Sequence, residues 1–483
     1  MMQTKTIISQ IMTMGLMFTG LITQAQKQPN IIFIIPDQMR AQTLEEGADR
    51  YVKTPTLDNF KERAVNFTQA VANYPLCSPT RGMIFSGTHP FRNQVMQNCQ
   101  SFTTHLDCEL QKDELCWSDI LKKNGYDLGY IGKWHLDSPR APYIDCKNNR
   151  GKRKWNEWCA PDRRHGFSYW HAYGTYDYHL NPMYWDTDAK RNEYKFYDQW
   201  GPIHEANKAI DYISNKGGTY RDTNKPFALV VSINPPHTSY SHVPQKYKDL
   251  YKDLDVTTLC NTPNIPKKGT KWGDYYRKNI KNYYACISGV DEQIGRVLQS
   301  LKDQGIDDNT IVIFTSDHGD CIGIHQQQGK NNWYEEAIRV PFIVKIPSHN
   351  KQIDVDHQLG SLDIYPTILG LLGLENQIPS HLKGINYTPA ITGVGKQKTT
   401  DHQWYIRTAN GVKEKGVRGV RTDRYTFIIE NKSDNKQYRY LFDRKNDPYQ
   451  LNNIVQKKRS KAKQMMKMLK NDLQKYDDPF VIL

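Results

Sequence analysis

Four apolar runs of the sequence are each followed at once by side chains that can bind a metal ion or transfer a proton. The runs are 31–35, 126–131, 227–233 and 310–315, and the side chains that follow them are Asp37, Lys133, His135, His237, Asp317 and His318. A single Asp or His after a strand usually caps a helix or fills a turn, but four coincidences are harder to explain in that way. Asp and His can share a divalent ion, and ligands rich in oxygen favour calcium or magnesium.

The four runs are continuously apolar rather than alternating, which is typical of strands buried on both faces of a parallel sheet. Helices are predicted between them at 57–64, 118–124 and 283–305, and the apolar residues of the last recur at a helical period. This alternation of strand and helix predicts an α/β fold with an open sheet. Ligands of such sheets bind outside the carboxyl ends of the strands, so we expect the polar side chains to converge there.

The end of the chain has a different pattern. Short alternating runs at 417–421, 425–429 and 438–442 predict antiparallel strands, and 457–476 predicts an amphipathic, lysine-rich helix. We therefore expect three parts, which are a leader at 1–25, a main α/β domain at 26–400 and a smaller C-terminal subdomain at 401–483 with an antiparallel sheet and a helix.

The first 25 residues have the features of a secretory signal peptide. Lys5 is their only charged residue, 7–22 is mainly apolar, and 23–25 offers small residues where a signal peptidase reads. No cysteine follows the expected cleavage site, so a lipoprotein anchor is not indicated. The sequence thus predicts an exported protein, periplasmic or secreted, without a membrane anchor.

Composition narrows the classes of partner. The chain has 483 residues, of which 38% are hydrophobic, enough for a packed core, and its net charge is +14. A mean hydropathy of −0.74 excludes a protein with many membrane spans. The positive charge favours anionic partners. For an exported protein we expect a charged small molecule or a polysaccharide rather than nucleic acid.

Two further features leave alternatives open. The nine cysteines are an odd number without any Cys-x-x-Cys pair, so we expect no structural zinc site, and several disulfide pairings are compatible with the sequence. The segment 146–164 carries seven basic residues, which are Lys147, Arg150, Lys152, Arg153, Lys154, Arg163 and Arg164. It is either an exposed loop or a rim that faces a polyanion.

The segment 76–87, with the sequence LCSPTRGMIFSG, resembles the signature of the type I, formylglycine-dependent sulfatases, and in particular exported bacterial carbohydrate sulfatases. In that family a maturase oxidises a cysteine to formylglycine (3-oxoalanine), whose hydrate attacks the sulfur of a sulfate ester. Cys77 stands at the oxidised position, Pro79 and Arg81 match, and Thr80 is an accepted substitute for serine. Ser78 and Pro79 suit the start of a helix, whose free N–H groups favour an anion.

The resemblance extends over almost the whole mature chain. Matching motifs are Gly-Lys-Trp-His at 132–135, Pro-Pro-His at 235–237, Ser-Asp-His-Gly-Asp at 316–320 and the lysine at 330. It implies one calcium ion (Ca2+), whose ligands would be Asp37, Gln38, Cys77, Asp317 and His318. Gln38 stands where the family often has a second aspartate, so this site has one negative charge fewer.

The resemblance also implies the roles of the catalytic residues, which would be Cys77, Arg81, Lys133, His135, His237 and Lys330. The two lysines would hold sulfate oxygens, and Arg81 would steady the formylglycine oxygen. His237 resembles the acid that protonates the leaving alcohol, and His135 resembles the base that releases sulfate and regenerates the aldehyde. Contacts to the substrate are expected from Trp134, His179, Glu335 and Arg339.

The implied fold is the alkaline-phosphatase-like sulfatase fold, with a large, mostly parallel sheet flanked by helices. The implied activity is that of a sulfuric ester hydrolase of the arylsulfatase type, acting on O-sulfated sugars of host or dietary glycans, with galactose or N-acetylgalactosamine favoured. The expected partners are a sulfated carbohydrate and a formylglycine-generating maturase. The alternatives are a phosphoester or phosphonate hydrolase of the same fold and a non-catalytic glycan-binding protein.

Overall fold

The computed structural model describes residues 28–483 except 48, 348 and 433–435. The signal peptide predicted at 1–25 lies outside the described residues. Within them, no helix combines the length and the apolar character that a membrane span needs.

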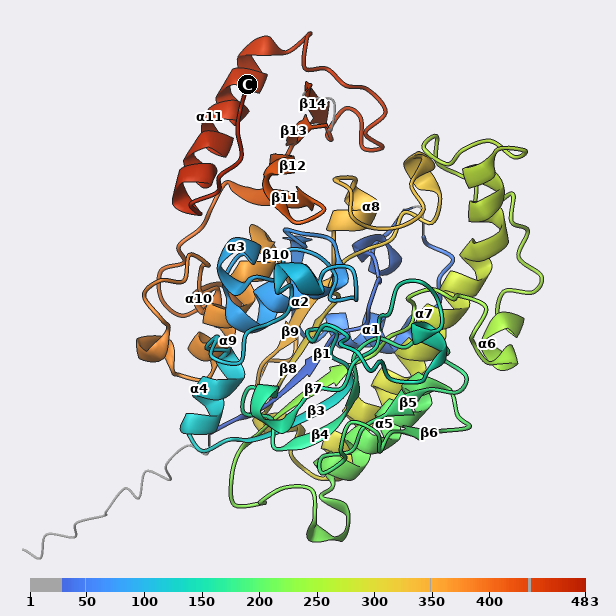
Figure 1. The fold of residues 1–483 in the computed structure, drawn as a ribbon, viewed down its shortest axis with the longest axis vertical. Helices are drawn as coiled ribbons and strands as arrows, with labels where there is room; N and C mark the ends of the chain where they lie inside the picture. The colour runs from blue at the N-terminus through green and yellow to red at the C-terminus, as the bar shows by residue number, and fades with distance from the viewer. Residues whose placement is uncertain (1–27, 48, 348, 433–435) are drawn as a thin grey trace, which may run out of the picture.

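An eight-stranded sheet forms the centre of the molecule (Figure 1). Its strands are β1 (Asn30–Ile34), β2 (Val65–Val71), β3 (Asp127–Lys133), β4 (Tyr169–Tyr173), β7 (Phe227–Ser232), β8 (Thr310–Thr315), β9 (Phe342–Lys345) and β10 (Ile353–Gly360). They lie in the order β10-β2-β9-β8-β1-β7-β3-β4, and only β9 runs antiparallel to its neighbours among these described strands. The four strands predicted from continuous apolar runs are confirmed as β1, β3, β7 and β8.

Helices cover both faces of this sheet. They are α1 (Pro55–Lys61), α2 (Cys77–Ser86), α3 (Pro90–Asn93), α4 (Trp117–Lys123), α5 (Gly201–Ile213), α6 (Gln245–Asp249), α7 (Lys271–Asp303), α8 (Glu335–Ile338), α9 (Ile364–Leu371) and α10 (Thr388–Thr392). Ile31 and Phe33 of β1 share a core with α2, α4 and α9. Ile32 and Ile34 face the opposite core, with α1, α5 and α7 (Figure 1). Because both faces of β1 are buried, its apolar run is continuous.

The long helix α7 begins earlier than predicted, at Lys271 instead of 283. The side chain of Thr270 caps it by accepting a hydrogen bond from the Gly273 N–H at 3.2 Å. Residues 271–282, which form the first turns of α7, are mostly polar. Tyr276 and Ile280 are the buried apolar side chains of this segment. Their weak periodicity explains why the sequence pattern predicted only the second part of the helix.

A separate antiparallel sheet follows near the C-terminus and lies at the top of Figure 1. Its strands are β11 (His402–Ala409), β12 (Val412–Thr422), β13 (Tyr425–Asn431) and β14 (Gln437–Asp443), and α11 (Arg459–Lys475) packs on it. The predicted strands and the terminal helix are thus confirmed, and β11 is an additional strand. A two-stranded ribbon of β5 (Met183–Tyr184) and β6 (Lys195–Phe196) lies beside β4, since Trp185 and Ala172 exchange two backbone hydrogen bonds.

Candidate active site

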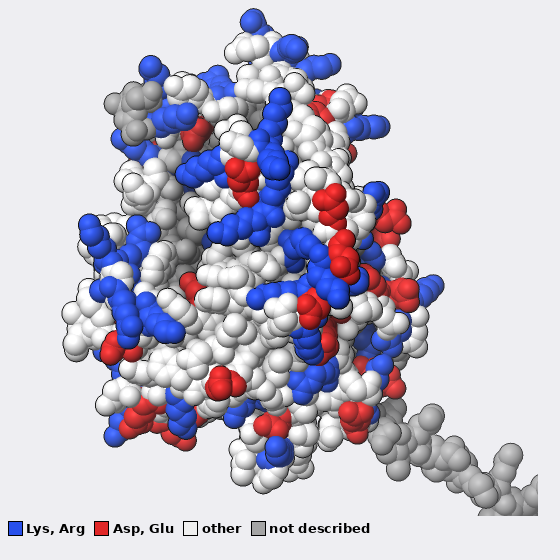
Figure 2. All heavy atoms as spheres, turned by 90° about the vertical axis from the view of Figure 1, so that its right-hand side faces the viewer, with Lys and Arg blue, Asp and Glu red and all other residues white. Residues whose placement is uncertain are grey.

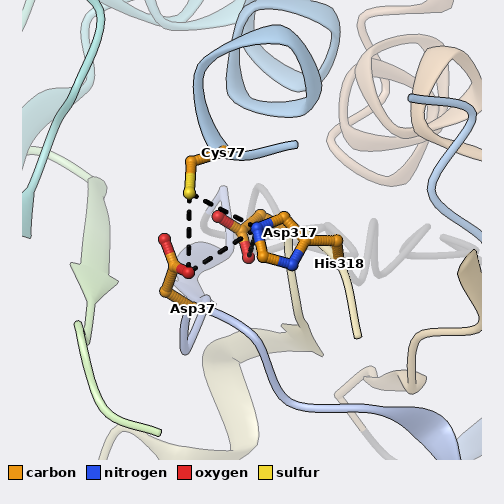
Figure 3. Close-up of side chains that lie close together, drawn as sticks. All are labelled: Asp37, Cys77, Asp317 and His318. Carbon is orange, nitrogen blue, oxygen red and sulfur yellow. Dashed lines mark hydrogen bonds and ion pairs between the residues drawn. The ribbon is translucent and has the colours of Figure 1, made fainter. Parts of the chain in front are cut away.

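The carboxyl ends of two neighbouring strands bring the predicted metal ligands together. Asp37 follows β1, Asp317 and His318 follow β8, and Cys77 is the first residue of α2. One ligand atom from each of the four lies within 4.8 Å of the other three (Figure 3). The Cys77 Sγ is 3.7 Å from Asp37 Oδ1 and 3.4 Å from His318 Nε2. Each of these side chains is buried, so the protein encloses the group.

The donor atoms fit a hard divalent cation. His318 Nε2 lies 3.6 Å from a carboxylate oxygen of Asp37 and 3.6 Å from one of Asp317. Burial and the neighbouring Asp37 raise the pKa of Asp317 to about 6. Two buried carboxylates that face one point repel each other, and a cation between them relieves that repulsion. Carboxylate oxygens with a single imidazole are more typical of calcium or magnesium than of structural zinc.

Left-handed backbone lets the chain turn sharply as it leaves the strands. Gln38 has φ +75° and His135 has φ +55°, a region that side chains rarely adopt and that is often found at functional sites. Gly132, at φ +98°, has no room for a side chain, since a Cβ there would lie 2.0 Å from the carbonyl oxygen of Ser232. The glycine of the Gly-Lys-Trp-His motif therefore allows β3 to approach β7 closely at the end of the strand, next to Lys133.

Two lysines flank the Cys77 side chain. Lys330 Nζ lies 3.0 Å from Cys77 Sγ and 2.7 Å from Gln38 Oε1. Lys133 Nζ lies 3.9 Å from the same sulfur and 2.7 Å from Asp37 Oδ2. Burial and Asp37 raise the pKa of the Cys77 thiol, but the two ammonium groups outweigh them and hold it well below its usual value. The site thus stabilises negative charge on this side chain.

Arg81 ties the carboxylates of Asp37 and Asp317 into one network. Its Nε donates to Asp317 Oδ2 at 3.1 Å, and its Nη2 donates to Asp37 Oδ2 at 3.2 Å. Gln38 joins the network through its backbone N–H, which donates to Asp317 Oδ1 at 3.1 Å, while its amide Nε2 donates to Asp320. The structure therefore places Gln38 at the site with its amide oxygen bound to a lysine.

His237 lies near the opening of the site, with its side chain 14% exposed. Its Nδ1 is 3.0 Å from Asp177 Oδ1. Burial and the two site lysines lower the pKa of His237, yet the carboxylates of Asp177 and Asp37 outweigh them and raise it to about 9. The imidazole is therefore protonated at neutral pH, as a general acid must be.

Replacing Asp177 by Asn is expected to shift the pH dependence of activity. The carboxylate stabilises the imidazolium, so its loss lowers the pKa of His237 and removes the proton at a lower pH. The alkaline limb of the kcat/KM profile on a sulfated sugar should move to lower pH by about one unit. Asp162→Asn serves as the control. An Asp177→Asn profile that coincides with the wild type would contradict this coupling.

His135 has the opposite electrostatic setting. Its Nε2 lies 3.2 Å from the Cys99 carbonyl oxygen, and its Nδ1 is buried without a hydrogen bond to any described residue. Burial lowers the pKa of His135, an effect that the nearby Cys77 only partly offsets. A neutral imidazole can accept a proton, so the two histidines differ in the direction that an acid and a base require.

The four residues expected to contact the substrate are placed differently. The His179 Nε2 lies 3.0 Å from the His237 carbonyl oxygen, close to the site. The Trp134 ring is 1% exposed and packs in the aromatic core, so it is not presented to a ligand. Glu335 and Arg339 bind other protein groups. Arg339 pairs with Glu45, and Glu335 pairs with arginines of the C-terminal sheet region.

Glu335, the first residue of α8, links the main domain to the C-terminal sheet through a buried ion pair. Arg421 of β12 donates to both of its carboxylate oxygens, at 2.9 and 2.8 Å, and Arg444 donates at 3.2 Å. Burial alone would raise the pKa of the Glu335 carboxyl. The guanidinium groups of Arg421 and Arg444 have the larger effect and hold this pKa well below its usual range. The structure thus supports a structural contribution from this residue.

Glu335→Ala is expected to destabilise the protein by about 3–5 kcal/mol, because it leaves the Arg421 charge buried and unpaired. Chemical denaturation would measure the loss, with the exposed Glu414→Ala as the control. If Glu335 contacted the substrate instead, KM would rise while the unfolding free energy stayed near that of the wild type.

Three residues that contact the site were not among the predicted site residues. For two of them, Asn234 and Asp320, the sequence held a signal, which is a strand end for the first and a motif for the second. Asn234 lies two residues after the end of β7, and its Oδ1 accepts a hydrogen bond from Lys133 Nζ at 3.0 Å. Asp320 lies in the Ser-Asp-His-Gly-Asp motif. Asp177 follows β4, a short aromatic strand that no aliphatic run had indicated.

All nine cysteines, which lie within the described residues, have free thiols in the structure. The predicted absence of a structural zinc site stays a prediction. A second group of potential ligands, Cys116, Asp119 and His165, lies at the start of α4, where Asp119 caps the helix by accepting from the Cys116 N–H.

Comparison with known proteins identifies the family. A model described as Sulfatase matches residues 29–374, and one for the C-terminal part of N-sulphoglucosamine sulphohydrolase matches 323–478. The chain belongs to the sulfatase family. It is 35% identical to an endo-4-O-sulfatase of Bacteroides thetaiotaomicron, with 95% of this chain and 94% of the relative covered. An ulvan-active sulfatase of Formosa agariphila is 32% identical, with 89% and 78% covered.

A solved structure of a sulfatase from Bacteroides fragilis has the same fold as this sulfatase. It superposes with a TM-score of 0.88 at 46% identity and covers 95% of this chain and 99% of its own. The expected alkaline-phosphatase-like fold is thereby confirmed. This sulfatase is a sulfuric ester hydrolase that acts on sulfate esters of glycans, so the comparisons favour the main prediction over a phosphoester hydrolase or a non-catalytic glycan-binding protein.

Proposed function

We propose that this sulfatase removes O-sulfate groups from galactose or N-acetylgalactosamine units of a glycan, with formylglycine at position 77 and one calcium ion. The observation that carries the proposal is the position of Cys77 at the start of α2, between Lys133 and Lys330 and next to the buried carboxylates of Asp37 and Asp317. The relative named endo-4-O-sulfatase supports the 4-O position and action within a chain.

Each residue of the site has a role that its surroundings support. The hydrated aldehyde of formylglycine would supply the oxygen that attacks sulfur. Lys133 and Lys330 hold the sulfate oxygens by charge-assisted hydrogen bonds, and Arg81 steadies the nucleophilic oxygen. His237 donates a proton to the leaving alcohol, and His135 accepts the proton that must leave residue 77 when sulfate is released.

Asp37, Gln38, Asp317 and His318 would hold the calcium ion together with the oxygen of residue 77. The bound ion would supply positive charge next to the sulfate and fix its orientation. Calcium is the first choice and magnesium the second, because the ligands are mainly oxygen atoms.

Removal of the metal is expected to lower turnover by roughly 10²-fold or more, since the charge of the ion is then lost. Elemental analysis of purified protein should show one calcium per chain, and Asp37→Asn should lose it, whereas the surface variant Asp162→Asn keeps it. Calcium should restore activity after chelation. Stoichiometric zinc, with activity restored only by zinc, would overturn the assignment.

A panel of mono-sulfated sugars tests the proposed substrate. Galactose and N-acetylgalactosamine sulfates should be turned over faster than the matching glucosamine sulfates, with 4-O-sulfates fastest. A clear preference for a glucosamine sulfate would refute the sugar assignment while leaving the sulfatase activity intact.

We further propose that the protein is exported after removal of residues 1–25 and that a maturase of the same cell forms the formylglycine. N-terminal sequencing of the protein from its native host tests the first proposal. A mature chain that begins at Met1 would contradict export by this route.

A further inference from the structure

A cluster of basic side chains without acidic partners lies beside the active site. Two of the seven basic residues of 146–164 have structural partners, since Arg163 pairs with Asp137 and Arg164 donates to backbone carbonyls. The other five have no carboxylate partner among the described residues. We call them the cationic loop, which comprises Lys147, Arg150, Lys152, Arg153 and Lys154.

One end of the cationic loop is fixed to the partner of the acid histidine. The side chain of Asn148 exchanges two hydrogen bonds with Asp177, since its Nδ2 donates to Oδ2 at 3.1 Å and its Oδ1 accepts from the Asp177 N–H at 3.2 Å. Asp177 in turn pairs with His237. Lys147 is therefore one residue away from a side chain that contacts the site directly.

The other end is fixed next to the base histidine. The backbone of Lys154 forms two hydrogen bonds with Ser101, both at 2.9 Å. The ring of Trp155 lies 6.3 Å from the ring of His135, and His135 bonds the carbonyl of Cys99, two residues before Ser101. The two ends of the loop are thus fixed next to the two histidines of the site, and the exposed charges of Arg150 and Lys152 lie in the segment between these ends.

Aromatic rings rather than carboxylates hold several of these cations. Lys147 Nζ lies 4.4 Å from the centre of the Tyr178 ring, and the Arg153 guanidinium lies 5.2 Å from that of Phe102. Phe102 is 52% exposed. A cation over a ring keeps its N–H groups free for an anion, and an exposed ring offers an apolar face for a sugar.

The net charge of the chain also favours binding of an anionic ligand. The chain carries +14, and Lys and Arg side chains dominate the upper and left parts of the face shown in Figure 2, whereas acids and bases alternate lower down. Arg150 and Lys152 are exposed and have no described ion pair, so their charge is unused within the protein. Arginine binds carboxylate and sulfate groups in a bidentate way.

We propose that the cationic loop binds the carboxylate or sulfate groups of sugars that flank the sulfated unit, so that the preferred substrate is a polyanionic glycan chain. This inference rests on the proposed function, because it assigns the neighbouring units of the same substrate. A single sulfated sugar fills only the enclosed site, while a chain also reaches the loop.

The test compares two substrates in the double variant Arg150→Gln/Lys152→Gln. We expect kcat/KM on a sulfated oligosaccharide with uronate units to fall about tenfold, since each exposed ion pair contributes a factor of a few. Turnover of a mono-sulfated neutral sugar should stay within about twofold. The control Lys467→Gln/Lys470→Gln removes the same charge from the exposed side of α11 and should change neither rate.

Salt and binding provide two further readouts. Added salt should weaken wild-type turnover of the oligosaccharide more than that of the double variant. Calorimetric binding of the same oligosaccharide to Cys77→Ala protein reports on the loop without turnover. Loop-dependent binding without hydrolysis of any sulfated sugar would refute the proposed function alone. Equal rates of the double variant and the wild type on the oligosaccharide, or equal losses on both substrates, would overturn the inference.

Discussion

Replacing Cys77 by Ala is expected to reduce turnover of every sulfate ester by at least about 10⁴-fold, because removal of a nucleophile that acts together with its acid and base costs nearly the whole catalytic effect. The wild-type peptide that spans residue 77, purified from the native host, should carry an aldehyde in place of the thiol. Mass spectrometry of that peptide makes the measurement.

The partly exposed Cys260 provides the matched control, since its thiol donates to the Val256 carbonyl, outside the site. Cys260→Ala should keep wild-type rates and the aldehyde at position 77. Fully active enzyme with an unmodified Cys77 thiol would refute the mechanism proposed for this sulfatase.

His237→Ala should separate substrates by the quality of their leaving group. A sugar alkoxide needs a proton as the S–O bond breaks, and loss of a general acid commonly costs ~10²–10⁴-fold. A nitrophenolate leaves without that help. The variant should therefore lose turnover of a sulfated sugar far more than turnover of a nitrophenyl sulfate, as kcat/KM values on both substrates will show.

His135→Ala is the companion variant. If His135 accepts the proton that allows sulfate release, both substrates should slow alike, and mass spectrometry should detect covalent sulfate on the enzyme. Equal losses of His237→Ala on both substrates would remove His237 from the acid role, and Lys330, 3.0 Å from the Cys77 sulfur, would become the next candidate.

The strand ends were predictable because burial on both faces leaves a continuous apolar run, as in β1 and β8. Such runs also predict that Asp37 and Asp317 converge, since parallel strands end at the same edge. Side-chain direction was not predictable in the same way. Within one motif, Lys133 points to the site while Trp134 points into the core, since neighbours at a strand end face opposite sides.

Partners that come from distant segments were also hidden in the sequence. Glu335 lies next to a matched motif, yet its charge is taken up by Arg421, which lies on the separate C-terminal sheet. Asp177 has no motif of its own, and only the fold shows that it pairs with His237. Local patterns identify such side chains as ionisable, but tertiary packing determines which of them bind substrate and which bind one another.

The enclosure of Cys77 has a consequence for the proposed conversion of this residue to formylglycine. The side chain is 1% exposed and lies beneath two lysines, so the active site of another protein cannot reach it once the chain has folded. We infer that the maturase acts on the nascent or unfolded chain. A molecule that folds with its thiol intact then stays inactive for its lifetime, and the active fraction of a preparation is fixed during synthesis, whatever amount of maturase it meets afterwards.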